Sequence, residues 1–152
     1  MAVFTKTGDD RYDYWLLNGS KTFSTIPANT INGIDFDMPI RLQIGDSFFG
    51  TKHIIKRHGV WVKQQQPNGC VATLLHKKLN TSGPIYLLDD NKIAIALRVA
   101  PDATIFLKMV NDFFSVTTMY YKRNLEISAN NTKKIRYMGS QWVNEPITRI
   151  QR

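Results

Sequence analysis

The sequence contains a single cysteine, Cys70, among its 152 residues, so it cannot form an intramolecular disulfide. Its stability is therefore not expected to depend on an oxidising compartment. A lone cysteine is more often a small buried residue than a nucleophile. No apolar run approaches the ~20 residues that span a bilayer, and the N-terminal stretch MAVFTKTGDDRYDYW lacks the basic and apolar regions of a signal peptide. These absences predict a soluble protein.

Recognisable motifs for metal ions and nucleotide cofactors are also missing. The chain has 3 histidines and 1 cysteine, and neither an HExxH nor a CxxC spacing occurs. No Walker-type or dinucleotide-binding glycine motif occurs either. We therefore expect neither a metal ion nor a cofactor.

Positive charge is in excess. Lys and Arg number 20 against 12 Asp and Glu, which gives a formal net charge of +8. Such a surplus favours contact with polyanions, namely nucleic acid or an anionic membrane surface. It is equally compatible with a surface whose cations only aid solubility.

The length fits one domain, and the pattern along the chain predicts an α+β fold. Residues 1–39 are expected to form an arm that packs on the domain, because aromatic residues alternate there with Gly, Asn, Ser and Thr. Residues 40–123 form the expected catalytic core, which opens with a short strand that ends at Gly45. A helix then runs to His58, and a second helix follows, with Val71, Leu74, Leu75 and Leu79 on one face. Residues 124–152 are a polar, basic extension that can add an edge strand.

The region from Ile85 to Arg123 contains four β-rich runs separated by three turn signals. The turn signals are Asp89-Asp90-Asn91, Pro101-Asp102 and Asn111-Asp112. In the second run Ile93, Ile95, Leu97 and Val99 share one face. The sequence thus predicts N-terminal helices packed on an antiparallel meander of four or more strands.

The segment GTKHIIKRHG holds two of the three histidines. On a helix, His58 lies in line with Ile54 and Ile55 and faces inward, whereas His53 shares a face with Arg57 and faces solvent or a bound anion. At the last helical position before Gly59, His58 would also sit where the helix dipole favours its protonated form. The alternative is that His58 is a half-buried structural residue and His53 a solvated one.

A second candidate cluster lies in SVTTMYYKR, at the end of the meander. On a strand, Thr118 and Tyr120 project to the same face, with Val116 before them and Lys122 after them. A hydroxyl, a phenol and an ammonium in a row are suited to holding a phosphate. Thr and Tyr are also ordinary strand formers, so a purely structural role stays open.

The pairing of these two motifs resembles the barnase/EndoU/colicin/RelE superfamily of metal-independent ribonucleases. The first motif is His53-Ile54 followed by Arg57-His58, and the second is the meander that ends in Thr118-Met119-Tyr120. The similarity covers about residues 44–123 and is strongest to phage-borne toxins and to the C-terminal toxins of contact-dependent growth inhibition. It implies a catalytic set and a phosphate-binding set of residues. The catalytic set is His58, with His53 as its competitor, Thr118 and Tyr120, and the phosphate-binding set is Lys52, Arg57, Arg98 and Lys122.

The chain departs from some of these relatives after the helical histidine. Ribonuclease-A-like toxins carry an HVGK signature and a further basic residue, whereas here Gly59-Val60-Trp61 follows. Arg57, Lys77, Lys78 or Arg98 could supply that cation. The resemblance further implies a monomeric toxin, exported as part of a larger effector, that acts in the target-cell cytoplasm and is blocked by a cognate immunity protein.

The expected function is therefore that of an endoribonuclease that cleaves RNA, with tRNA as the expected substrate, by attack of the 2′-hydroxyl on its own phosphate. Two alternatives from other classes remain. One is a basic RNA-binding module without chemistry, and the other is a phage- or secretion-associated interaction protein.

Overall fold

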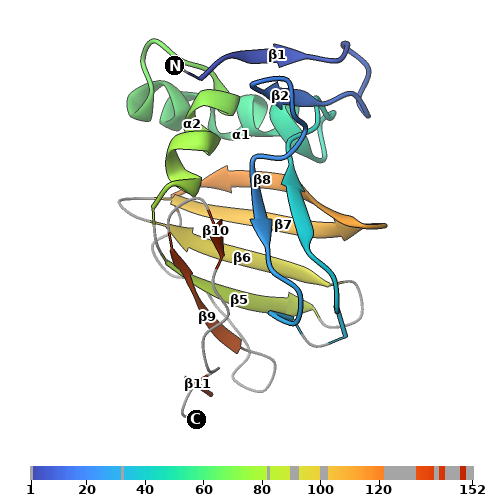
Figure 1. Ribbon diagram of the computed structural model, residues 1–152. Coiled ribbons are helices and arrows are strands. Elements are labelled where there is room, and N and C mark those ends of the chain that lie inside the picture. The colour runs from blue at the N-terminus through green and yellow to red at the C-terminus, as the bar shows by residue number, and fades with distance from the viewer. Residues whose placement is uncertain are drawn as a thin grey trace.

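The computed structural model describes residues 2–31, 33–81, 83–89, 93–99 and 103–121, together with the strand segments at 133–138, 141–142 and 148–149. Two helices and a series of strands make up the fold (Figure 1). In chain order they are β1 (Phe4–Lys6), β2 (Trp15–Leu17), β3 (Ser24–Ile26), β4 (Met38–Arg41), α1 (Gly50–Gln65), α2 (Val71–Leu79), β5 (Gly83–Asp89), β6 (Ala94–Val99), β7 (Ala103–Val110), β8 (Phe113–Tyr120), β9 (Lys133–Met138), β10 (Gln141–Trp142) and β11 (Thr148–Arg149).

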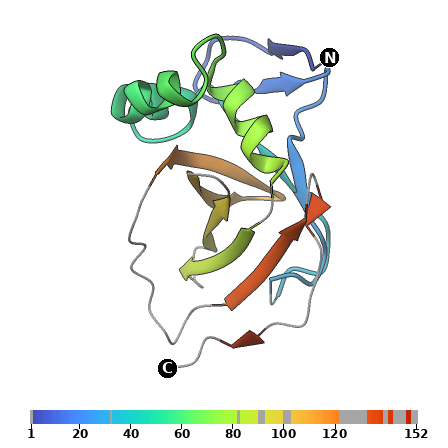
Figure 2. The same ribbon diagram turned by 90° about the vertical axis from the view of Figure 1, so that its left-hand side faces the viewer.

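One large sheet dominates the fold, with the strand order β10-β3-β4-β8-β7-β6-β5-β9-β11. β10 also pairs with β9, so the sheet curls back on itself (Figure 2). β1 and β2 form a separate two-stranded sheet that lies beside the helices (Figure 1).

The α+β class is as predicted, but two details of the prediction are wrong. The helices are not N-terminal, because four strands precede α1, and two of these, β3 and β4, belong to the large sheet. The sheet is also mixed, because β4 runs parallel to β8 and β10 runs parallel to β3. β3 and β4 have three and four residues. Strands this short have little periodicity of their own, and their partners lie far along the chain.

The meander is confirmed. β5, β6, β7 and β8 pair with one another in sequence and antiparallel. In β6 the side chains of Ile95, Leu97 and Val99 are buried in the core, as the alternation predicted. Asn111 takes a positive φ of 55° in the turn between β7 and β8. The Pro101-Asp102 turn and part of the turn after Asp89 lie outside the described residues.

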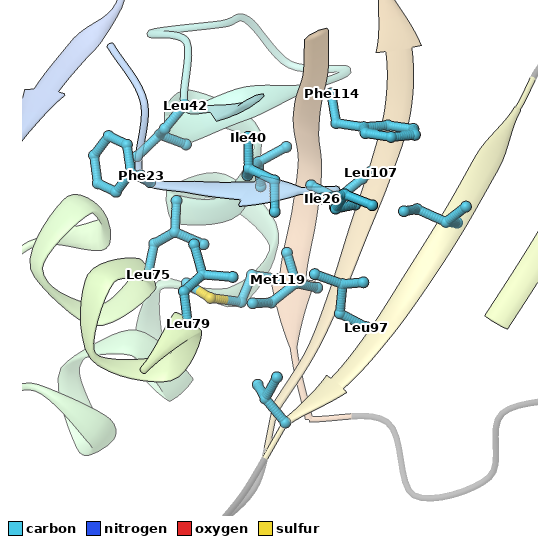
Figure 3. Packing of buried hydrophobic residues seen from close by; sticks show 14 of the residues in the cluster. Phe23, Ile26, Ile40, Leu42, Leu75, Leu79, Leu97, Leu107, Phe114 and Met119 are labelled. Atoms are coloured by element: carbon cyan, nitrogen blue, oxygen red, sulfur yellow. The ribbon is translucent and has the colours of Figure 1, made fainter. Parts of the chain in front are cut away.

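The core lies inside the curl of the sheet (Figure 3). Leu75 and Leu79 of α2 pack there with residues from strands on both sides, and the predicted apolar face of this helix is buried. The side chains labelled in the close-up are Phe23, Ile26, Ile40, Leu42, Leu75, Leu79, Leu97, Leu107, Phe114 and Met119.

The segment predicted as an arm contributes to this core through Phe23, Ile26 and Met38. A hydrogen bond of 2.9 Å from the Ser115 hydroxyl to Gln43 Oε1 further ties the early part of the chain to β8. In the predicted extension, β9 pairs antiparallel with β5. Among the described residues, no helix has the length and apolar character needed to cross a membrane.

Helix α1 extends beyond the predicted end at His58 and reaches Gln65. His58 interrupts it with non-helical angles, φ −136° and ψ 21°, so the helix is kinked there. Gly59 does not stop the helix, because its backbone does not take the positive φ of a C-terminal glycine. His58 therefore marks the break between two helical segments: the first ends there, as predicted, and the second continues to Gln65.

Candidate active site

The rings of His58 and Tyr120 stack on each other. Their centroids are 4.1 Å apart and their planes differ by 13°. Tyr120 also stacks on Phe106 of the neighbouring strand, at 5.6 Å and 18°. The structure thus brings together the helical histidine and the strand tyrosine, which the sequence analysis placed in one site although 61 positions separate them.

Helix α1 can reach Tyr120 because β8 is paired along only part of one edge. The pairing with β4 involves Phe114 and Ser115 alone, whereas β7 pairs along nearly the whole of β8. Helix α1 lies along β8 (Figure 1). On α1, Ile54 and Val62 are buried in the core, and His58 lies between them at a spacing of four residues, so it faces the sheet.

A β-bulge changes the predicted facing of the strand residues. The register with β7 shifts so that Leu107 pairs with Val116 and Phe106 with Thr118, which leaves Thr117 as an extra residue. Thr118 and Tyr120 share one face, as predicted, but Val116 is buried in the core on the other face. The prediction that Val116 lies in line with them is wrong because simple alternation cannot reveal a bulge.

Thr104 is a site neighbour that the sequence analysis missed. It pairs with Tyr120 on one side and with Arg98 on the other, so the three residues form a row across β8, β7 and β6. The hydroxyl oxygens of Thr104 and Thr118 are both buried and have no hydrogen-bond partner. Finding Thr104 from sequence would have required the exact register across the Pro101-Asp102 turn.

The ring of His53 lies edge-on to that of His58. The two ring centroids are 6.4 Å apart, with an interplanar angle of 82°. His53 Nδ1 lies 2.8 Å from the carbonyl oxygen of Ser47. Because a carbonyl only accepts, Nδ1 carries the proton and Nε2 is the nitrogen left for chemistry. His53 is half-buried, and its contact with the ring of His58 was not predicted. The prediction that it faces solvent or a bound anion stays open.

Burial lowers the pKa of His58 below its usual value, and the nearby charges of His53 and Arg57 lower it further. The imidazole is therefore neutral at pH 7 and able to accept a proton. The direction is opposite to the one expected from the helix dipole, because burial and the charges of His53 and Arg57 all disfavour the protonated form.

The remaining predicted residues differ in exposure. Ile55, expected to face inward, is 56% exposed, so Ile54 alone marks the buried side of the helix at this point. Lys52 and Arg57 are exposed on α1, and Arg98 is half-buried in the row with Thr104. Of the further candidate cations, Lys77 is exposed and Lys78 is buried in α2, and Lys122 lies outside the described residues.

In the part of the chain that the structure describes, no three His, Cys, Asp or Glu side chains gather in a group that could hold a metal ion. Cys70 is half-buried before α2, with its sulfur 3.4 Å from the Thr73 hydroxyl. The third histidine, His76, packs edge-on against Phe4, whose strand belongs to the separate two-stranded sheet.

Comparison with protein-family models, with curated proteins and with solved structures gives no significant match.

Proposed function

We propose that this protein is a metal-independent endoribonuclease that cleaves RNA by 2′-hydroxyl transesterification. One observation carries the proposal: His58, whose pKa is lowered, stacks at 4.1 Å on Tyr120, and a second histidine lies 6.4 Å away. Cleavage of this kind needs one group that accepts a proton, one that donates a proton and a means to stabilise the charge on the phosphate. Two imidazoles side by side can supply the first two.

His58 takes the role of general base. It removes the proton from the 2′-hydroxyl, whose oxygen attacks the adjacent phosphorus and displaces the 5′-oxygen of the next nucleotide. His53, in its doubly protonated form, delivers the Nε2 proton to that leaving oxygen and keeps its Nδ1–H on the Ser47 carbonyl. The products are a 2′,3′-cyclic phosphate and a free 5′-hydroxyl, so bonds and protons balance without a further reactant.

Tyr120 holds the plane of the His58 ring by stacking, and its phenol is a hydrogen-bond donor for the phosphate. Arg57 supplies positive charge from the exposed side of the helix. Thr118 belongs to the same strand face, but its hydroxyl is buried, so a contact with phosphate requires the side chains that cover it to move. DNA lacks the attacking hydroxyl and is expected to remain uncut.

The test is incubation of total tRNA with the protein in the presence of EDTA. Cleavage that leaves cyclic phosphate ends is expected. His58→Ala should lower the rate by about 100-fold or more, and His53→Ala should also lower it, because each removes a group that transfers a proton. His76→Ala is the matched control, since this histidine lies on the other helix. RNA that stays intact at stoichiometric protein would contradict the proposal.

Two details of the same proposal follow from the family resemblance. The substrate is tRNA, and the protein is a toxin that is delivered to a target cell and held inactive by an immunity protein.

The second candidate is an RNA-binding module without chemistry. The exposed cations Lys52, Lys56 and Arg57 on α1 favour it, because they suit a phosphate backbone whether or not a bond is cut. It predicts a gel shift of labelled RNA with no cleavage.

A further inference from the structure

Phe48 is the most exposed large hydrophobic side chain of the described residues, with 80% of its surface accessible. An aromatic ring left in water forgoes the stabilisation that burial would give it. A single exposed aromatic is common on protein surfaces, so its surroundings decide whether it has a role.

The loop that carries Phe48 is held in place. The Phe48 amide donates a hydrogen bond of 2.8 Å to Asp46 Oδ1, and the Asp46 amide donates one of 3.0 Å to the Phe49 carbonyl. Gly45 and Gly50 flank the loop with φ angles of 74° and 75°. At Gly45 a side chain would collide with the Phe49 carbonyl oxygen, so the loop depends on glycine there. Phe48 is thus presented to solvent by a fixed backbone.

The same loop orients one of the candidate catalytic histidines. The carbonyl of Ser47, the residue before Phe48, accepts the hydrogen bond from His53 Nδ1. A ligand that covers Phe48 is therefore within a few ångströms of the backbone that positions His53.

The charge around Phe48 suits an anionic ligand. Lys52 and Lys56 are exposed on the first turns of α1, and this helix contains no acidic residue. Two acids are involved. The Asp46 carboxylate is engaged by the Phe48 amide and lies 3.7 Å from the Arg11 guanidinium. Asp9, which interacts electrostatically with Lys52, is paired with Lys6 at 3.0 Å. A ring beside exposed lysines is the combination with which proteins bind single-stranded nucleic acid: bases stack on the aromatic ring, and phosphates meet the cations.

We propose that Phe48 is a stacking platform for an unpaired base of the RNA substrate, next to the phosphate that is cut. The proposal rests on the proposed function and narrows the substrate class to single-stranded RNA or to loops of a folded RNA. In a duplex the bases are stacked on one another and cannot lie on the ring. Stacking does not distinguish base edges, so this contact selects strandedness rather than sequence.

The experiment measures binding separately from cleavage. Fluorescence anisotropy is recorded with a fully 2′-O-methylated RNA oligomer, which cannot be cut, as a single strand and annealed to its complement as a blunt two-stranded duplex. Phe48→Ala should weaken binding of the single strand by about tenfold and leave the duplex unchanged. Phe48→Trp, which keeps an aromatic surface, should restore the affinity. Because Phe48 is exposed, none of these changes should impair folding.

Phe36→Ala is the matched control. Phe36 is 42% exposed and lies in the connection between β3 and β4, which extends away from α1 (Figure 1). Its removal should leave binding unchanged. Equal affinity of the parent and Phe48→Ala for the single strand would overturn the proposal, as would equal losses in the Phe48 and Phe36 variants.

Cleavage of unmodified RNA, assayed in parallel, separates the two proposals. If the parent cuts RNA and Phe48→Ala cuts and binds single strands equally well, the stacking role is refuted while the nuclease stands. If the parent cuts nothing but Phe48→Ala still loses affinity for single strands, the nuclease is refuted and the ring is confirmed as an RNA contact.

Discussion

At the scale of single residues, Tyr120 has two separable contributions, its ring and its hydroxyl. The ring stacks on His58 and Phe106. Tyr120→Ala removes both stacks and should lower the free energy of unfolding by about 2–3 kcal/mol. Tyr120→Phe keeps them and should cost less than about 1 kcal/mol. Urea unfolding of the two variants measures this difference, and equal losses would show that the stack contributes nothing.

His58 gives the stability a defined pH dependence. Its pKa is lower in the folded protein than in the unfolded chain, so the unfolded state binds more protons as the pH falls below the ordinary histidine value of about 6.5. The stabilisation from neutral His58 is complete above that pH and is lost as the pH falls toward the folded pKa. The difference between the unfolding midpoints of the parent and of His58→Gln should therefore be smaller at about pH 5.5 than at about pH 7.5. A constant difference would contradict the lowered pKa.

Helix and strand periodicity predicted the facing of His58 and of Tyr120 separately, and the family resemblance implied that the two meet in one site. Periodicity was not sufficient for His53 or Val116. The place of His53 depends on the kink at His58 and on the Ser47 carbonyl, and that of Val116 on a bulge. These are irregularities of backbone geometry, and a pattern built on regular periods cannot report them.

At the scale of elements, replacement of glycine by alanine is expected to have opposite effects on stability at two positions of α1, Gly59 and Gly50. A Cβ at Gly59 would meet only the Ile55 side chain, at 3.9 Å, and its φ is not positive. Since alanine is favoured over glycine inside a helix, Gly59→Ala should raise the free energy of unfolding by up to about 1 kcal/mol.

Gly50→Ala is the contrasting variant. Gly50 has φ +75°, and a Cβ there would lie 2.7 Å from the Gln43 carbonyl oxygen. This variant should be destabilised by about 1–3 kcal/mol. Thermal or urea unfolding of the pair provides the comparison, and a stable Gly50→Ala protein would show that the loop before α1 is not constrained as described.

Elements with a strong local pattern were the ones that could be predicted. Helix α2 and the meander follow from repeated apolar spacing and from turn residues between the strands. By contrast, the parallel pairing of β4 with β8 joins Ile40 to Phe114. No local signal in either strand indicates so distant a partner, so the mixed character of the sheet appears only in the structure.

At the scale of the whole molecule, the net charge of +8 predicts that RNA binding weakens with salt. Each phosphate contact releases condensed counterions, and log Kd against log salt has a slope of about 0.7 per contact for single strands. Replacing Lys52, Lys56 and Arg57 together by Gln should lower the slope by about 2. Titrations at several salt concentrations measure it. Replacing Lys77, which is exposed on α2, is the control and should not change the slope.

The strand that carries Tyr120 lies between β4 and β7, yet it is the last of the six strands from β3 to β8 to be translated. A nascent chain whose synthesis has stopped before Phe113 therefore lacks the strand between β4 and β7. His58 of α1 then has no Tyr120 ring to stack on. Such a ribosome-bound chain lacks the assembled site although both helices and the other five of these strands have been synthesised. Any activity that depends on the stack can begin only after β8 has left the exit tunnel and inserted.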